Sequence, residues 1–244
     1  MHMAQNIYDR PDFFANYSAL ARSMHGLAGA PEWPALRAML PPMEGLRVVD
    51  LGCGFGWFCR WASEHGASEV TGIDLSENML ARARAETTDP SVTYLQADLE
   101  QLDLPQSAFD LAYSSLALHY VEDAGKLFRT IHRALGAGGR FVFSTEHPIF
   151  MAPARQEWIA DASGRRTWPV NGYSLEGPRT SDWLAKGVVK YHRTLGTTLN
   201  LLVATGFIID RVEEFSPTEA QVADNPALAE ERERPMFLLV SVHR

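Results

Sequence analysis

The sequence has few cysteines, no long apolar run and fewer basic than acidic residues. Only Cys53 and Cys59 occur among 244 residues, which is typical of reduced thiols in a cytosolic protein and not of a disulfide framework. No apolar run reaches the roughly 20 residues that span a membrane, and residues 1–4 do not begin a signal-peptide pattern. We therefore expect a cytoplasmic protein without a membrane partner.

The balance of charge argues against a nucleic-acid partner. The chain carries 22 Lys and Arg against 30 Asp and Glu, a formal net charge of −8. A broad phosphate-binding surface needs an excess of positive charge, so we expect no nucleic-acid substrate. Because 46% of the residues are hydrophobic, the chain is long enough to bury the core of one α/β domain.

A glycine-rich loop follows the first apolar strand. Residues 46–51 form a predicted buried strand that contains Asp50. The glycines that follow stand at every second position: Gly52, Gly54 and Gly56. A second predicted strand, 70–74, ends at Asp74, where an acid can accept hydrogen bonds from a ribose held over the loop. These features predict a site for a nucleoside-bearing cofactor.

The glycine spacing favours a cofactor without phosphate. Dinucleotide-binding loops follow the pattern GxGxxG, and their third glycine lets helix amides hold a pyrophosphate. Here Trp57 occupies that third position. An adenosine with an amino-acid tail needs only an open loop and an acid such as Asp50 facing its ammonium group. An NAD(P)-dependent oxidoreductase stays the alternative, because it would share Asp74.

Strands and helices alternate from residue 46 onward. The predicted strands after the first two are 92–96, 109–114, 140–145, 207–214 and 236–243. The predicted helices between them are 57–65, one capped by Ser76, 123–135 and 197–205, and a polar loop precedes the last strand. This order predicts an α/β fold, a doubly wound and mostly parallel sheet with helices on both faces.

We expect one domain with four parts. Helices within residues 1–44 are expected to cover the cofactor, and residues 45–145 form the cofactor-binding core. Residues 146–191 are rich in Trp, Pro, Gly and Arg with little periodicity, which is typical of a lid or a binding insertion. Residues 192–244 supply the last strands of the sheet.

Taken together, these landmarks resemble the class I, Rossmann-like S-adenosylmethionine-dependent methyltransferases. The similarity is to the small-molecule branch, methyltransferase type 11, which includes quinone-biosynthesis enzymes. It covers residues 45–145 strongly and the C-terminal strands moderately. The matching positions are Asp50 to Gly56, Asp74, Ala97-Asp98-Leu99, Phe109-Asp110, Ser114 to Ala117 and Gly138-Gly139. The resemblance implies S-adenosylmethionine as cofactor and a seven-stranded Rossmann-like sheet whose last strand is antiparallel.

The resemblance also implies roles for single residues at the cofactor site. Asp74 would accept from the ribose hydroxyls and Asp98 from the adenine amine, although Asp74 could instead cap a helix and Asp98 a turn. An aromatic ring such as Tyr17 could hold a sulfonium. The predicted cofactor-binding residues are Asp50, Gly52, Gly54, Gly56, Asp74, Leu75, Met79, Asp98, Leu99, Ser114 and Tyr17.

The methyl acceptor is expected at the carboxyl ends of the strands, beneath residues 146–191. Arginines and tryptophans in that segment favour a small anionic or aromatic acceptor, such as a carboxylate or a phenolate. The predicted catalytic residues are His119, His147 and His192. The predicted substrate-binding residues are Tyr120, Arg179, Trp183 and Tyr191.

Missing subclass signatures narrow the reaction. The Ser114 to Ala117 segment is not the Asn/Asp-Pro-Pro-aromatic loop of enzymes that methylate DNA bases. Glu146 and His147 alone do not make an octahedral oxygen site, so we expect in-line methyl transfer without a metal. A non-catalytic S-adenosylmethionine-binding protein would share every cofactor feature and is the second alternative. The methylated atom, any general base and the oligomeric state stay open.

Overall fold

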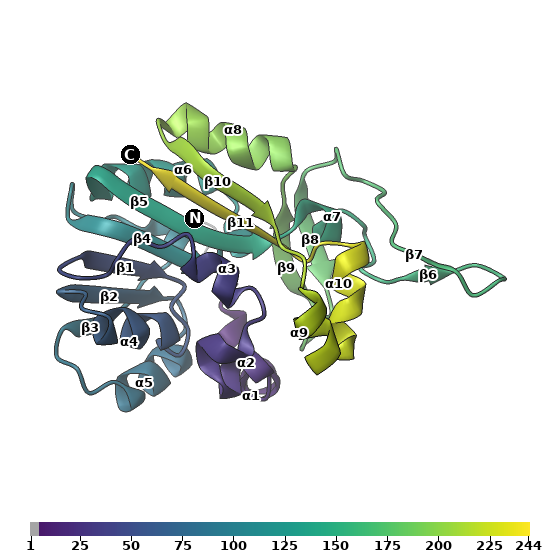
Figure 1. The fold of residues 1–244 in the computed structure, drawn as a ribbon, viewed down its shortest axis with the longest axis horizontal. Coiled ribbons are helices and arrows are strands. Elements are labelled where there is room, and N and C mark those ends of the chain that lie inside the picture. Colours follow the sequence, from purple (N-terminus) through teal and green to yellow (C-terminus); the bar gives the residue numbers. More distant parts are fainter. Residues whose placement is uncertain (1–4) are drawn as a thin grey trace.

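A seven-stranded sheet forms the centre of the computed structural model, which describes residues 5–244 (Figure 1). Residues 1–4, where the sequence predicts no signal peptide, lie outside that range. The strands of this sheet are β1 (Arg47–Leu51), β2 (Glu69–Asp74), β3 (Val92–Gln96), β4 (Phe109–Ser115), β5 (Leu135–Glu146), β10 (Ile208–Glu214) and β11 (Phe237–His243).

The topology is the one that the sequence predicts. The strand order is β10-β11-β5-β4-β1-β2-β3. Neighbouring strands from β5 to β3 pair in parallel, whereas β11 is antiparallel to both β5 and β10. The Rossmann-like, mostly parallel sheet with an antiparallel last strand is therefore confirmed. Crossovers place helices on both faces of such a sheet.

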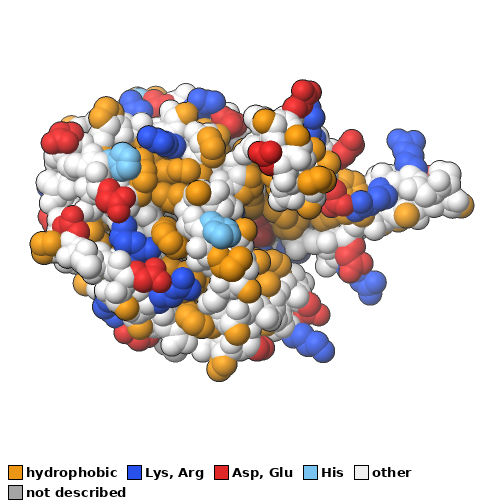
Figure 2. Space-filling model, turned by 60° about the horizontal axis from the view of Figure 1, so that its bottom comes forward, with side chains coloured by type: hydrophobic (Ala, Val, Ile, Leu, Met, Phe, Trp, Pro, Cys, Tyr) orange, Lys and Arg blue, Asp and Glu red, His pale blue; other side chains and the backbone are white. Residues whose placement is uncertain are grey.

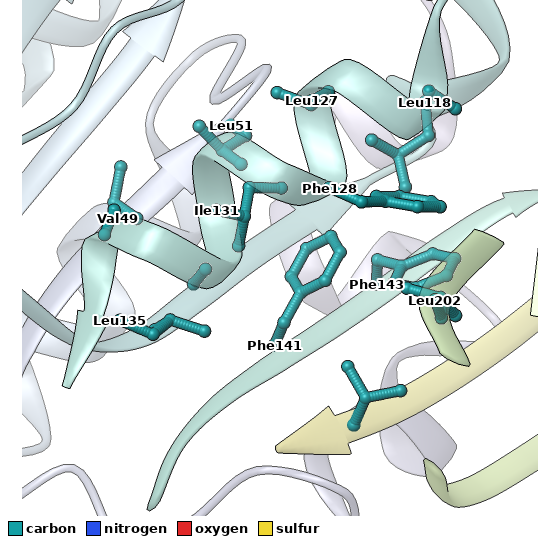
Figure 3. Close-up of a cluster of buried hydrophobic side chains, with 14 of the residues drawn as sticks. Val49, Leu51, Leu118, Leu127, Phe128, Ile131, Leu135, Phe141, Phe143 and Leu202 are labelled. Atoms are coloured by element: carbon teal, nitrogen blue, oxygen red, sulfur yellow. The ribbon is translucent and has the colours of Figure 1, made fainter. Parts of the chain in front are cut away.

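Two buried clusters cover the two faces of the sheet. Side chains alternate along a strand, so Val48 of β1 packs on one face while Val49 and Leu51 pack on the other. Figure 3 shows the second cluster, in which Phe141 and Phe143 of β5 meet α6. The helices on the Val48 face are α3 (Trp33–Arg37), α4 (Trp57–Glu64) and α5 (Glu77–Glu86); those on the other face are α6 (Ala124–Ala134) and α8 (Leu195–Thr205).

The N-terminal part folds as short helices beside the carboxyl ends of the central strands (Figure 1). They are η1 (Ile7–Asp9), α1 (Pro11–Ser18), α2 (Ala21–Met24) and η2 (Gly26–Gly29). Asp9 joins this segment to α5, because its carboxylate accepts from the Ser76 hydroxyl and from the Asn78 N–H at 3.1 Å. The segment is thereby held over the glycine loop and β2.

The insertion after β5 contains regular structure that the sequence pattern did not predict. Its elements are α7 (Pro148–Met151), β6 (Ile159–Ala160), β7 (Arg166–Thr167), β8 (Gly177–Ser181) and β9 (Val188–His192). The antiparallel pair β6 and β7 forms an arm that extends away from the body (Figures 1 and 2). The second antiparallel pair, β8 and β9, lies beside the body (Figure 1). The arm is therefore the part of the insertion that lies farthest from the sheet (Figure 1).

The prediction of a polar loop before the last strand is wrong. The segment folds into α9 (Glu219–Asp224), η5 (Pro226–Ala229) and α10 (Glu230–Glu233). Thr218 and Gln221 form a capping box, in which each side chain bonds the other's backbone N–H. The sequence spacing Thr-x-x-Gln carries that signal and could have predicted this helix start. None of the helices within residues 5–244 has the length and hydropathy needed to cross a bilayer.

Candidate active site

A cavity of about 1140 Å³ lies at the carboxyl ends of the central strands. Its walls come from the N-terminal helices, the loops after β1 to β5, the return through β9, and α9 and α10. In Figure 2, hydrophobic side chains gather in the hollow beside the base of the arm. This is the edge of a parallel sheet where ligands bind in open α/β folds.

The loop after β1 needs glycine for two separate reasons. Gly52 and Gly56 have φ angles of +77° and +74°, which disfavour any side chain. A Cβ would also lie 2.4 Å from the Ala117 Cβ at Gly52, and 2.1 Å from the Tyr94 hydroxyl at Gly56. Gly52 and Gly54 line the cavity, whereas Gly56 begins α4 behind it. The loop therefore brings bare backbone to the cavity wall.

Asp74 ends β2 and faces the cavity in a fixed orientation. Its carboxylate accepts from the Gly54 N–H at 2.8 Å and from the Ser76 N–H at 2.9 Å. Burial raises the pKa of Asp74 above its ordinary value, and the two backbone donors limit that rise. Each carboxylate oxygen has a further lone pair, so the group can still accept from a ligand hydroxyl.

Asp98 lines the cavity at the carboxyl end of β3. It caps η3 (Leu99–Gln101) by accepting from the Glu100 N–H at 2.9 Å. The predicted apolar residues Leu75, Met79 and Leu99 line the same cavity, as does Tyr17. An acid beside an apolar slot suits a flat base with an exocyclic amine.

Besides Gly56, two predicted cofactor residues do not line the cavity: Asp50 and Ser114. Asp50 is buried and accepts from the Cys59 thiol at 3.3 Å, and burial raises its pKa to about 7. Alternation along β1 directs it toward α4, on the same side as Val48. Ser114 is also buried, and its hydroxyl donates to the Leu51 carbonyl at 2.7 Å. Its neighbour Ser115 lines the cavity instead.

Arg22 of α2 is a cavity residue that the sequence did not single out. Its guanidinium pairs with the fully buried Glu32 at 2.9 Å and lies 5.6 Å from the centre of the Phe237 ring. Glu32 thus fixes the guanidinium while leaving other N–H groups to face a ligand. No periodic pattern in the N-terminal helices marks this position.

His119 and Tyr120 form part of the wall beyond the cofactor residues. His119 lies in η4 (Leu118–Tyr120), and its Nδ1 accepts from the Glu146 N–H at 3.4 Å. Burial, together with Lys190 and other cations, holds the pKa of His119 well below its ordinary value. The ring is therefore neutral at pH 7, and the Glu146 contact assigns its proton to Nε2.

Lys190 and Glu146 form a buried ion pair in the same wall. The Lys190 ammonium also lies 4.7 Å from the Trp183 ring centre and 5.9 Å from that of Tyr120. The second carboxylate oxygen of Glu146, Oε2, is buried without a hydrogen-bond partner among residues 5–244. Trp183 and Tyr191, both predicted substrate residues, line the cavity here. Glu146, the last residue of β5, was not predicted to bind substrate.

Three predicted acceptor residues are not brought to the cavity: His147, His192 and Arg179. His147 Nε2 contacts Glu214 at 2.9 Å while its Nδ1 caps α7. His192 bonds the Tyr173 carbonyl at 2.8 Å. Arg179 donates to four backbone carbonyls of the insertion. Each of these side chains is engaged in holding the insertion together.

The side-chain clusters of the structure bear on metal binding. Across residues 5–244, no three His, Cys, Asp or Glu side chains are arranged to hold a metal ion. Metal-independent chemistry stays a prediction.

Comparison with known proteins identifies the family. A profile described as a methyltransferase domain matches residues 49–143. The crystal structure of an S-adenosylmethionine dependent methyltransferase from Mesorhizobium loti is 70% identical, with a TM-score of 0.87, and the match covers 90% of this chain and 100% of that one. A structure from Listeria monocytogenes assigned to the same class is 44% identical with a TM-score of 0.84, covering 90% and 99%.

Curated malonyl-[acyl-carrier protein] O-methyltransferases match a shorter part of the chain. A malonyl-[acyl-carrier protein] O-methyltransferase of Enterobacter lignolyticus is 37% identical over 52% of this chain and 49% of its own length. The chain thus aligns with about half the length of such relatives. The domain profile, the nearly full-length match to a solved structure at 70% identity and the site geometry agree, and the chain belongs to the class I S-adenosylmethionine-dependent methyltransferases.

Proposed function

We propose that this methyltransferase acts on a small molecule bound in the same cavity as its cofactor. The observation that carries the proposal is that Asp74 and Asp98 line one cavity together with His119, Tyr120 and Tyr191. Its volume of about 1140 Å³ slightly exceeds the usual range of small-molecule pockets, roughly 300–1,000 Å³. That space suits a cofactor and one small acceptor side by side.

The chemistry of the cavity wall fits S-adenosylmethionine. We assign Asp74 to the ribose hydroxyls and Asp98 to the adenine amine, with Leu75 and Met79 against the base. We assign Arg22 to the carboxylate of the amino-acid tail, because it is the one arginine among the described residues that line the cavity. When bound, this cofactor supplies an electrophilic methyl group on a sulfonium.

The chain's own residues would then position the acceptor and exclude water. Methyl transfer gains most of its rate from holding the two reacting groups in line. The neutral His119 ring can donate from Nε2 to an acceptor atom and so orient it. Tyr17 and Trp183 supply aromatic walls. His147 and His192 have no part in the proposal, because they lie outside the cavity.

The alternatives predict different binding. An NAD(P)-dependent oxidoreductase gains no support from the relatives, and a non-catalytic protein would bind the cofactor without transferring its methyl group. The first test is calorimetric titration with S-adenosylmethionine, S-adenosylhomocysteine and NADH. The second is release of S-adenosylhomocysteine when pooled small metabolites are added. Cofactor binding without any turnover across acceptor pools would favour the non-catalytic reading.

The site assignment itself is tested by Asp74→Asn. We expect at least a tenfold loss of S-adenosylhomocysteine affinity, since a carboxylate accepts hydroxyl donors more strongly than an amide. The matched control is Asp110→Asn, because Asp110 pairs with Arg47 at 2.9 Å at the opposite end of the sheet. Equal affinity in Asp74→Asn and the wild type would refute the assignment.

A further inference from the structure

The charged groups of the acceptor half favour a ligand that donates hydrogen bonds. Eight described lining side chains of the whole cavity are carboxylates, and three are Lys or Arg. From the end of β5 onward, the charged lining residues are Glu146, Lys190, Asp224 and Glu231. This half of the cavity therefore carries more negative than positive side chains.

Lys190, the cation that lines this half, and Arg234, which lies outside the lining, are both already paired with acids of this chain. Lys190 forms an ion pair with Glu146, and both side chains are almost fully buried. Glu231 of α10 is paired with Arg234 at 3.1 Å. An anionic acceptor would have to compete with an internal carboxylate for either cation, at the cost of desolvating its own charge.

Unused hydrogen-bonding capacity at the cavity wall belongs to carboxylate oxygens. The Oε2 atoms of Glu146 and Glu231 are both buried, and neither has a hydrogen-bond partner among residues 5–244. Both residues line the cavity. Buried carboxylate oxygens are costly unless a donor meets them. Arg234 also leaves Nε and Nη1 without partners, but it is not among the residues that line the cavity.

Aromatic rings surround the same place. The Lys190 ammonium rests against Trp183 and Tyr120, so both rings already contact one positive charge of the chain itself. The Tyr8 hydroxyl lies 3.2 Å from that of Tyr120, and its ring extends the wall toward Tyr17. Rings of this kind attract cations through their faces and pack against apolar bodies.

We infer that the acceptor is a small amine with an apolar or aromatic body, whose ammonium group is held by Glu146 Oε2 and Glu231 Oε2. The inference rests on the proposed function and names the acceptor class for that site. It replaces the anionic acceptor expected from the arginines of the insertion. Of those arginines, Arg166 of β7 pairs with Glu230, and Arg179 bonds backbone carbonyls.

The test compares three probes with one body and different charge: phenethylamine, 3-phenylpropanamide and 3-phenylpropanoate. Each is titrated by calorimetry into the protein saturated with S-adenosylhomocysteine, so that only the acceptor half is free. We expect phenethylamine to bind at least tenfold more tightly than the carboxylate, with the amide between them. Equal affinities, a preference for the carboxylate, or no binding of the amine would overturn the inference.

Variants assign the preference to the two carboxylates. Glu146→Gln and Glu231→Gln should each weaken phenethylamine binding at least fivefold and leave S-adenosylhomocysteine affinity unchanged. The matched control is Glu213→Gln, whose carboxylate pairs with Arg211 on β10. Unchanged amine affinity in both cavity variants refutes the assignment. Failure of the wild type to bind S-adenosylhomocysteine would refute the proposed function itself, and the acceptor class with it.

Discussion

The carboxylate of Asp9 accepts a hydrogen bond from the backbone N–H of Asn78 at 3.1 Å, and so joins the N-terminal segment to the first turn of α5. The same carboxylate bonds the Ser76 hydroxyl, and these contacts lower the pKa of Asp9 despite the opposing effect of burial. An acid at a helix N-terminus is stabilised by the free N–H groups and by the helix dipole.

Asp9→Ala should therefore loosen the N-terminal cover of the cofactor site. We expect faster limited proteolysis within residues 5–30 and a three- to tenfold faster release of S-adenosylhomocysteine, measured by stopped-flow fluorescence. Asp12→Ala is the control, because Asp12 is exposed and forms its ion pair with Arg10 on the same segment. Identical release rates in the two variants would show that this contact does not hold the cover closed.

Gly56 should tolerate alanine less well than Gly45. Both have φ angles near +74°, so either substitution costs about 1–2 kcal/mol for left-handed backbone. Only at Gly56 does the new Cβ also meet Tyr94, whereas nothing lies within 4 Å at Gly45. Urea denaturation should show a larger loss of unfolding free energy for Gly56→Ala. A smaller or equal loss would mean that Tyr94 moves aside at little cost.

Arg22→Gln should weaken binding of the amino-acid tail of the cofactor and leave binding of its adenosine end unchanged. We expect about tenfold weaker binding of S-adenosylhomocysteine, because the carboxylate of its tail loses a charged partner. Binding of 5′-methylthioadenosine, which lacks that tail, should be unchanged. Arg37→Gln is the control, since Arg37 of α3 lies against Trp61 of α4 and does not line the cavity. Equal losses for both nucleosides would place Arg22 elsewhere than at the carboxylate.

Asp50 should make stability depend on pH. Burial raises its pKa in the folded protein to about 7, whereas the unfolded value is about 3.9. Between these values the folded state binds a proton that the unfolded state lacks, so this group stabilises the fold as pH falls from 7 toward 4. The contribution is on the order of 1 kcal/mol per pH unit.

Asp50→Asn mimics the protonated carboxyl and should remove that contribution. Urea denaturation of both proteins at several pH values checks this. The buried histidines contribute the same pH dependence to both proteins, so the difference in unfolding free energy reports Asp50. The unfolding free energy of the wild type should approach or exceed that of the variant as pH falls. A difference that stays constant from pH 7 to pH 4 contradicts a raised pKa at Asp50.

The sequence by itself determined the sheet and the half of the cavity that we assign to the cofactor. Hydrophobic runs broken by turns predict buried parallel strands. Gly52 and Gly56 stand where a positive φ and close neighbours both disfavour a side chain. Asp74 and Asp98 follow their strands directly, so the topology alone brings them to one edge. Such features depend on residues close together in the chain, and a sequence pattern records them.

Only the tertiary structure decided the rest of the cavity. Glu146 meets Lys190 from 44 positions away, and Arg22 enters from the N-terminal helices. His147, one residue beyond Glu146, turns instead to Glu214. Of two residues adjacent in the chain, either one can face the cavity. The choice depends on the partners that other segments of the chain place beside each side chain. Long-range ion pairs leave no local periodicity, so the sequence could propose these positions but could not choose among them.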